Sequence, residues 1–193
     1  MGLIESIDYQ ILAGIITHVR CDVLTPVVVF ITRLGDNGLI WLALAAACLA
    51  RRRTRACGAA ILLVLALGLL VGNMGIKQIV ARPRPFQTYP ELVNLIKQGG
   101  YSFPSAHSMS SFAAATVFYR FAQQDGHAIR GIPPLVLAAL IALSRLYVCV
   151  HYPSDVLCGA LLGIALAFAA VWLTKQVSGW LNQRRPHEKK KTK

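Results

Sequence analysis

The chain has 193 residues, of which 55% are hydrophobic and 15% are charged, whereas a soluble domain of this size carries about a quarter charged residues. This composition excludes an ordinary soluble enzyme and indicates a membrane protein. The formal net charge of +12 is concentrated in Arg51–Arg55 and after residue 183, next to apolar runs. That pattern is typical of cytoplasmic loops and of contact with anionic lipid, and it argues against a nucleic-acid-binding surface.

The N-terminal segment, residues 1–34, predicts helices that are only partly apolar. Residues 3–19 place apolar side chains at helical spacing, with Glu5 and Asp8 between them, and residues 22–34 are similar. We expect amphipathic helices at a membrane interface. A re-entrant hairpin and an imperfect span are the alternatives, because about 20 apolar residues are needed to cross a bilayer. The acidic residues before the apolar positions predict that there is no cleaved signal peptide.

From Leu39 onward the apolar runs predict five crossings, or six if the N-terminal segment contributes one. No strand pattern occurs, so the expected fold is an all-α, polytopic helical membrane bundle. Residues 1–182 should form one integral membrane domain, and residues 183–193 a basic, disordered cytoplasmic tail. The expected spans are residues 39–50, 56–80, 108–122, 132–150 and 156–174.

The basic segments predict the orientation of this bundle. Arg51–Arg55, the turn bounded by Arg120 and Arg130, and the C-terminal tail all fall on one face if the spans are counted as above. The positive-inside rule assigns that face to the cytoplasm. The loop of residues 81–105 and the region of His151 then lie on the outer face.

Three short motifs occur at the outer ends of the predicted spans. Their basic side chains supply the fixed positive donors that a phosphate group needs, in a chain that otherwise avoids charge in its spans. Ser105 precedes a helical run, so its hydroxyl can cap the helix or bind a ligand, and the amides of Ala106 and His107 point toward an anion. The motifs are Lys77 with Arg84-Pro85, Pro104-Ser105-Ala106-His107, and Ser144-Arg145 with His151 and Asp155.

This ordered set, over residues 77–155, resembles the type 2 phosphatidic acid phosphatase (lipid phosphate phosphatase) family, and within it the bacterial membrane branch that includes undecaprenyl-diphosphatases. The resemblance implies a core like that of acid phosphatases and vanadium haloperoxidases. It also implies that His151 attacks phosphorus, that His107 protonates the leaving oxygen and then activates water, and that Asp155 orients His151. The phosphate-binding residues implied are Lys77, Arg84, Ser105, Ala106 and Arg145.

Two positions qualify the resemblance. Ala106 stands where the family most often has Gly, and an Ala is strained if that position requires a positive φ. Arg82-Pro83 and Arg84-Pro85 are both Arg-Pro pairs; the spacing from Lys77 selects Arg84 and leaves Arg82 as a supporting or head-group contact.

The expected function is metal-independent hydrolysis of a membrane lipid phosphate or pyrophosphate through a phosphohistidine, in particular of undecaprenyl pyrophosphate to undecaprenyl phosphate. Phosphatidylglycerophosphate and phosphatidic acid are alternative substrates, because the motifs hold only the phosphate. A vanadate-dependent oxidase and a non-enzymatic lipid transporter are alternatives of other classes. We expect no cofactor, no metal and no nucleic-acid partner, only the lipid substrate and membrane lipids, in a multi-pass protein of the bacterial inner membrane. Taken singly, Lys77 could merely snorkel to the interface and His151 could be an interfacial residue.

Overall fold

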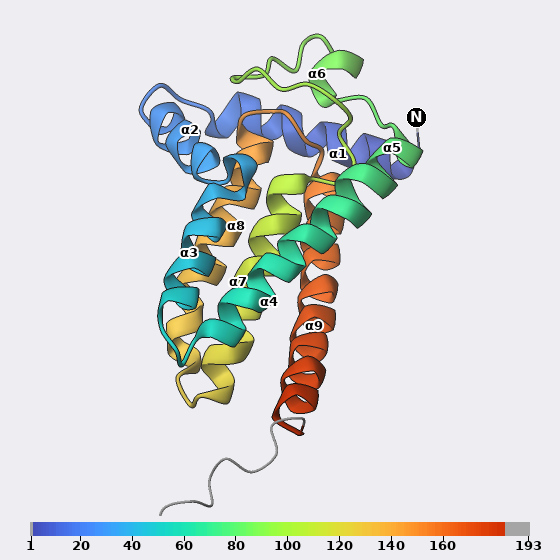
Figure 1. Ribbon diagram of the computed structural model, residues 1–193. Helices are drawn as coiled ribbons and strands as arrows, with labels where there is room; N and C mark the ends of the chain where they lie inside the picture. Colours follow the sequence, from blue (N-terminus) through green and yellow to red (C-terminus); the bar gives the residue numbers. More distant parts are fainter. Residues whose placement is uncertain (1, 184–193) are drawn as a thin grey trace, which may run out of the picture.

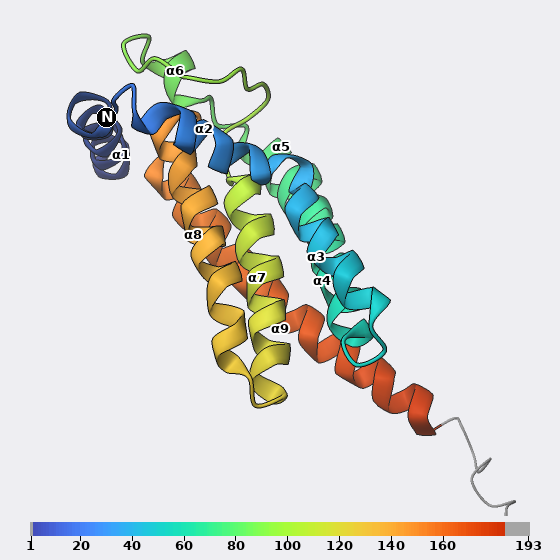
Figure 2. The same cartoon turned by 90° about the vertical axis from the view of Figure 1, so that its left-hand side faces the viewer.

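The computed structural model describes residues 2–183, and within that range every regular element is helical (Figures 1 and 2). The all-α prediction is therefore confirmed for the described residues. Short π-helical and 3₁₀ turns, labelled η, join several of the helices. In chain order the elements are α1 (Leu3–Gly14), η1 (Ile15–Val19), α2 (Leu24–Leu34), η2 (Asp36–Gly38), α3 (Leu39–Ala50), α4 (Arg55–Gly68), η3 (Leu69–Ile76), α5 (Lys77–Val80), α6 (Pro85–Thr88), α7 (Ala106–Gln124), η4 (Ala128–Gly131), α8 (Ile132–Tyr147) and α9 (Pro153–Gln183).

Among the described residues, three helical runs are long and apolar enough to cross a membrane: Arg55–Thr88, Ala128–Tyr147 and Pro153–Val177. The pair α2 and α3, which bend by 46° at their junction, adds a fourth if the two helices form one span. Their outward surfaces carry many exposed leucine, valine and phenylalanine side chains, as expected for helices that face lipid. The fold is a helical membrane bundle, as predicted.

Helix α7 occupies the middle of the bundle, packed against α4, α8 and α9 (Figure 1). It is less apolar than its neighbours, and it buries Ser108, Ser111 and Thr116. Ser111 accepts a hydrogen bond from Trp41 Nε1 at 2.9 Å. Because the surrounding helices shield α7, polar side chains are tolerated there. It corresponds to the predicted span of residues 108–122, but it is not among the described helices that are apolar enough to cross a membrane, so three or four such segments are found where five or six crossings were predicted.

Helix α1 lies across one end of the bundle rather than along it (Figures 1 and 2). Leu3, Ile4 and Ile7 on one side of it are exposed, whereas Asp8 and Leu12 on the neighbouring side are buried against the protein. Apolar side chains thus lie on the exposed side of α1, and the place of this helix at a membrane interface stays a prediction.

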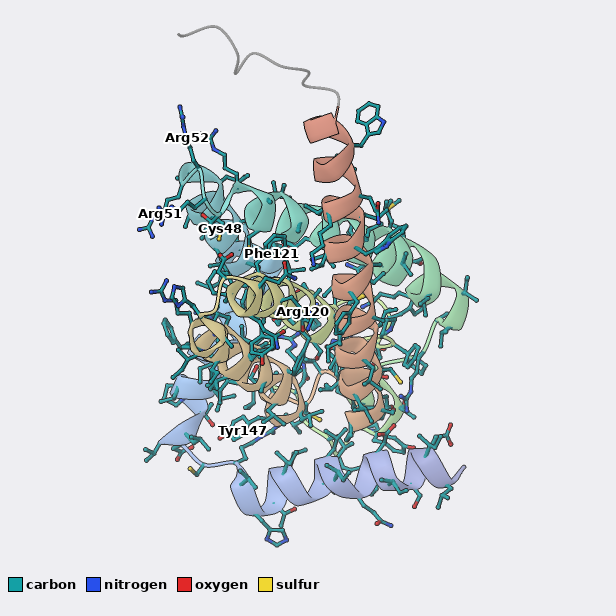
Figure 3. All side chains as sticks on the ribbon, turned by 90° about the horizontal axis from the view of Figure 1, so that it is seen from below. Cys48, Arg51, Arg52, Arg120, Phe121 and Tyr147 are labelled. Carbon is teal, nitrogen blue, oxygen red and sulfur yellow. The ribbon has the colours of Figure 1, made fainter. Side chains whose placement is uncertain are left out.

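The basic turn Arg51–Arg55 lies at the opposite end of the bundle from α1, together with the α7–α8 turn and the end of α9 (Figure 1). Figure 3 shows Arg51 and Arg52 projecting away from the bundle at that end. The segments predicted to share one face are thus grouped together, and the predicted basic tail lies almost wholly outside the described residues.

Several predicted boundaries were wrong by a few residues near the outer motifs. Helix α7 begins at Ala106, α8 ends at Tyr147 instead of continuing to Val150, and the loop of residues 81–105 contains the short helix α6. Helix α8 ends early because the backbone turns sharply at Cys149, whose φ of 57° is incompatible with a continuing helix. As a result, His151 lies in a turn between two helices.

Candidate active site

A cavity of about 690 Å³ opens between α4 with η3, the start of α7 and residues 98–101. Lys77, Arg84 and His107 line it, so these three motif residues share one space although up to 30 positions separate them in the chain. Asn73 lines it too, as expected for a polar residue on the same helical face as Lys77. Its other walls are largely apolar, formed by side chains such as Leu42, Leu62, Leu65, Leu69 and Met109.

His151 is buried behind this cavity, with 2% of its surface exposed. Its Nε2 is 3.4 Å from Arg84 Nη1, and its Nδ1 is 3.5 Å from Asp155 Oδ2. A guanidinium can only donate and a carboxylate can only accept, so these neighbours assign the hydrogen to Nδ1 and leave a lone pair on Nε2. Burial, reinforced by the charges of Arg145 and Arg84, lowers the pKa of His151 to about 3 despite the opposing effect of Asp155. The ring is therefore neutral at physiological pH, with its lone pair on Nε2.

Asp155 lies in the first turn of α9, where Pro153 begins the helix as predicted. Oδ2, the oxygen that faces His151, also accepts hydrogen bonds from the Tyr152 amide at 2.9 Å and from the Ser102 hydroxyl. Oδ1 accepts one from Arg82 Nη1 at 2.7 Å. With both oxygens occupied, the carboxylate has a fixed orientation relative to the imidazole ring.

Arg84 connects the cavity to His151, and backbone carbonyls hold its guanidinium. Nε donates to Gly99 and Gly100, Nη2 donates to Gly99 and Tyr101, and Nη1 donates to Val150 over distances of 2.7 to 3.1 Å. The N–H that remains, on Nη1, is the one beside the Nε2 lone pair of His151. A phosphoryl group attacked at Nε2 would therefore meet a fixed donor.

Arg145 is fully buried near the end of α8. Its Nη1 donates to Thr32 Oγ1 at 2.7 Å and its Nη2 donates to Gln98 Oε1 at 2.8 Å, while its buried Nε has no partner. A buried, unpaired N–H of a charged group is costly, and an anionic ligand would satisfy it. This arrangement fits the phosphate-binding role that the resemblance implies.

His107 lies in the first turn of α7, and its Nε2 is 3.0 Å from Asp36 Oδ1. The turn that carries Asp36 approaches the ring so closely that a Cβ at the neighbouring Gly35 would lie 2.7 Å from the imidazole Cδ2. Burial and the charge of Arg145 lower the pKa of His107 to about 4, while the Asp36 carboxylate acts in the opposite direction by favouring the protonated ring. Because the ring lines the cavity, a proton bound with the help of Asp36 can pass to an oxygen of a ligand there.

The other two residues of the His107 motif have local roles in starting α7. Ser105 is the N-cap: its hydroxyl accepts from the Ser108 amide at 3.4 Å and from the Ser108 hydroxyl at 2.9 Å. Of the two roles that the sequence allowed, the structure shows the capping one. Ala106 is the first helical residue of α7 and has no positive φ, so the condition under which an Ala would be strained there is not met.

Lys77 follows η3, a π-helical widening of the long α4–α5 helix. Its Nζ donates to the Tyr101 carbonyl at 3.3 Å, which turns the ammonium group toward the loop that also holds Arg84. π-Helical turns often occur at functional sites, because they re-aim the side chains that follow them.

The structure thus brings all the predicted site residues together, some around the cavity and some directly behind it. It also shows partners that the sequence did not single out: Asp36 for His107, Thr32 and Gln98 for Arg145, and Ser102 for Asp155. The only available signal for Asp36 was its position, an acidic residue in the turn before an apolar span. Among the described residues, no three His, Cys, Asp or Glu side chains are grouped as metal ligands.

Comparison with known proteins identifies the family. Residues 57–178 match the PAP2 superfamily. An undecaprenyl-diphosphatase of Sulfolobus acidocaldarius is 29% identical over 169 residues, which cover 86% of this chain and 79% of that protein. A decaprenylphosphoryl-5-phosphoribose phosphatase of Mycobacterium tuberculosis is 38% identical over 140 residues, 69% of this chain and 71% of that protein.

The fold matches as well. The crystal structure of a transmembrane PAP2-type phosphatidylglycerolphosphate phosphatase from Bacillus subtilis superposes with a TM-score of 0.77 at 26% identity, covering 92% of this chain and 89% of the other. The resemblance carried by residues 77–155 is therefore confirmed, and this multi-pass membrane protein belongs to the PAP2 superfamily.

Proposed function

We propose that the chain hydrolyses a lipid pyrophosphate, undecaprenyl pyrophosphate in particular, through a phosphohistidine at His151. The observation that carries the proposal is the contact between Arg84 and His151, which places a fixed donor at the nucleophilic lone pair. Such preorganised donors stabilise the charge that develops on phosphoryl oxygens, often more than acid–base groups do.

In the first step the Nε2 lone pair of His151 attacks phosphorus, and the bond between phosphorus and the leaving oxygen breaks. The second imidazole, His107, gives its proton to that oxygen. Arg84, Arg145 and Lys77 stabilise the phosphoryl oxygens while charge moves through them. For a pyrophosphate the leaving group is the lipid monophosphate.

In the second step water attacks the phosphohistidine. Neutral His107 takes a proton from the water, the nitrogen–phosphorus bond breaks, and the electron pair returns to Nε2 of His151. Inorganic phosphate leaves and both rings regain their starting protonation. Asp155 stabilises the Nδ1–H of His151 throughout, so that Nε2 remains the reactive atom.

The cavity supports a lipid substrate. Its polar part carries Lys77, Arg84 and His107, and its leucine-rich part extends beside α3 and α4. An isoprenoid or acyl chain would cover these apolar walls, whereas a soluble phosphomonoester would leave them exposed to water. The undecaprenyl-diphosphatase relative, aligned over most of the chain, favours the pyrophosphate; the phosphatidylglycerolphosphate phosphatase of matching fold favours the second candidate, phosphatidylglycerophosphate.

We further propose that the site faces the outer side of a bacterial inner membrane. The site and the basic turn at Arg51–Arg55 lie at opposite ends of the bundle, and basic loops are retained in the cytoplasm. Labelling single cysteines, introduced at exposed positions of each end into a variant without its own cysteines, with an impermeant maleimide in intact cells tests this. Labelling of the Arg51–Arg55 end alone would refute it.

Phosphate release in detergent tests the function. Initial rates with undecaprenyl pyrophosphate, phosphatidylglycerophosphate and phosphatidic acid should give the highest kcat/KM for the pyrophosphate, and EDTA should not change them. The variant His151→Ala should lose activity by at least about a thousandfold, since no other nucleophile can replace the imidazole.

Three results would contradict the proposal in different ways. Activity that persists in His151→Ala would refute the phosphohistidine, and inhibition by EDTA would refute the metal-independent reaction. Wild-type protein that releases phosphate from none of the lipids would favour a lipid transporter.

A further inference from the structure

Asp8 is a carboxylate that α1 buries although half of the residues of that helix are exposed. Its side chain is 3% accessible, and each oxygen has partners at the start of α9. Oδ1 accepts from the Ser154 amide at 2.9 Å, and Oδ2 accepts from the Ser154 hydroxyl at 2.5 Å. Asp8 therefore caps α9 from another helix and fixes the turn that carries Asp155.

Arg82 joins Asp8 to Asp155. Nη2 donates to Asp8 Oδ2 at 2.8 Å, while Nη1 donates to Asp155 Oδ1 at 2.7 Å and to Ser154 Oγ at 2.8 Å. The guanidinium also lies over the Tyr152 ring, with 3.8 Å between Cζ and the ring centroid. A planar fork stacked on an aromatic ring and bonded to two carboxylates has one orientation.

That orientation matters because the two oxygens of Asp155 have separate tasks. Oδ2 faces His151 Nδ1, and Oδ1 is held by Arg82. A rotation of the carboxylate that released Oδ1 would also move Oδ2 away from the imidazole. The fork thus controls how well Asp155 holds the ring.

We propose that Asp8 and Arg82 are positioning residues for the reaction, acting in series: Asp8 orients Arg82, Arg82 orients Asp155, and Asp155 orients the nucleophile His151. This assigns α1 a part in catalysis, although α1 contributes no side chain to the cavity. The inference rests on the proposed function of His151.

The test uses Asp8→Asn, Arg82→Gln and the double variant in full-length protein, with kcat, KM and thermal unfolding measured in detergent. Each single change should lower kcat by roughly tenfold to a hundredfold with KM within about twofold, because a small misplacement of the nucleophile slows chemistry more than binding. In the double variant the loss of kcat should be clearly smaller than the product of the two single losses, since Asp8 orients Asp155 largely through Arg82.

Two further variants keep the test decisive if the neutral changes impair folding. Arg82→Lys retains the charge but cannot bond both carboxylates in a fork, so it should fold and still lose kcat. Glu5→Gln removes an exposed carboxylate from the same helix and should leave kcat unchanged.

Effects of Asp8→Asn and Arg82→Gln that multiply in the double variant would overturn the series, and so would a full kcat in Arg82→Lys. Both outcomes are measured relative to the kcat of active wild-type protein. An inactive wild type, or an active His151→Ala, would instead refute the proposed function.

Discussion

Gly159, on α9, sets the distance between the two halves of the site. A Cβ built at this position would lie 2.6 Å from the Ser105 carbonyl oxygen and 3.3 Å from both Ser105 N and Ser108 Cβ. The first of these atoms belongs to the backbone and cannot rotate away. Ordinary contact requires about 3.4 Å, so Gly159→Ala must push the start of α7 away from α9 by roughly 0.8 Å.

This displacement would alter both stability and catalysis. The Ser105 amide donates to the Asp155 carbonyl at 3.1 Å, and a shift of that size breaks the bond. We expect overpacking to lower the free energy of unfolding by about 1–3 kcal/mol, partly offset by the better helix propensity of alanine, about 1 kcal/mol. His107 moves relative to His151, so kcat/KM should fall by roughly tenfold to a hundredfold.

The assay is phosphate release from the lipid substrate, together with thermal unfolding, for Gly159→Ala and for the matched control Gly14→Ala. A Cβ at Gly14, at the end of α1, would have no atom within 4 Å, and Gly14 does not line the cavity. The control should keep both its activity and its unfolding temperature. A Gly159→Ala protein as stable and as active as the control would refute the reasoning.

Three further predictions concern the charged groups of the site. Asp36→Asn removes the carboxylate that stabilises the protonated ring of His107, so kcat for lipid substrates should fall by about tenfold or more. An aryl phosphate, whose leaving group needs no proton, should show little loss of kcat. An equal loss on both substrates would contradict this role of Asp36. The pKa of His151 lies near 3 in the folded protein and near 6.5 when unfolded, so between these values the unfolded state binds the extra proton and stability falls as the pH falls. His151 should contribute about 2 kcal/mol to the loss from pH 7 to pH 5, and His151→Gln should remove that part, whereas the part due to His107, whose pKa is also lowered, should remain. Unfolding midpoints with the same pH dependence in both proteins would rule this out. Arg145→Lys keeps the charge, but a lysine cannot bond Thr32, Gln98 and a phosphate oxygen at once. The kcat/KM in the phosphate-release assay should therefore drop about a hundredfold. Near-normal activity would show that a point charge suffices.

The membrane-spanning segments were predictable because a helix that crosses lipid must be a long run of apolar residues. The runs that begin at Leu39 and Ala56 are apolar and are followed by arginine or proline residues. In the structure the helical segments over these two runs begin and end within one residue of the predicted positions. The three motifs were predictable for a different reason: phosphate chemistry needs a particular set of residues at close spacing, and residues such as His151 and Asp155 are only four positions apart.

Pairings between distant parts of the chain were not predictable in the same way. Asp36 and His107 are 71 positions apart, and Asp8 and Arg82 are 74 apart, so no local pattern joins them. Whether a lone carboxylate faces water or a buried arginine depends on how α1 and α2 lie over the bundle, and the sequence left that topology open. The early end of α8 likewise depends on a single backbone turn at Cys149, a residue type that gives no turn signal.

The polar character of α7 has a consequence for how the protein is made. A segment that buries Ser108, Ser111 and Thr116 and ends in two glutamines has little tendency to leave water for lipid by itself, yet it must become the innermost helix. The helices that shield it on two sides, α8 and α9, are synthesised after it. The packing around α7 is therefore completed only when α9 has entered the membrane, so a nascent chain cannot bring the residues of the candidate site together before α9 arrives.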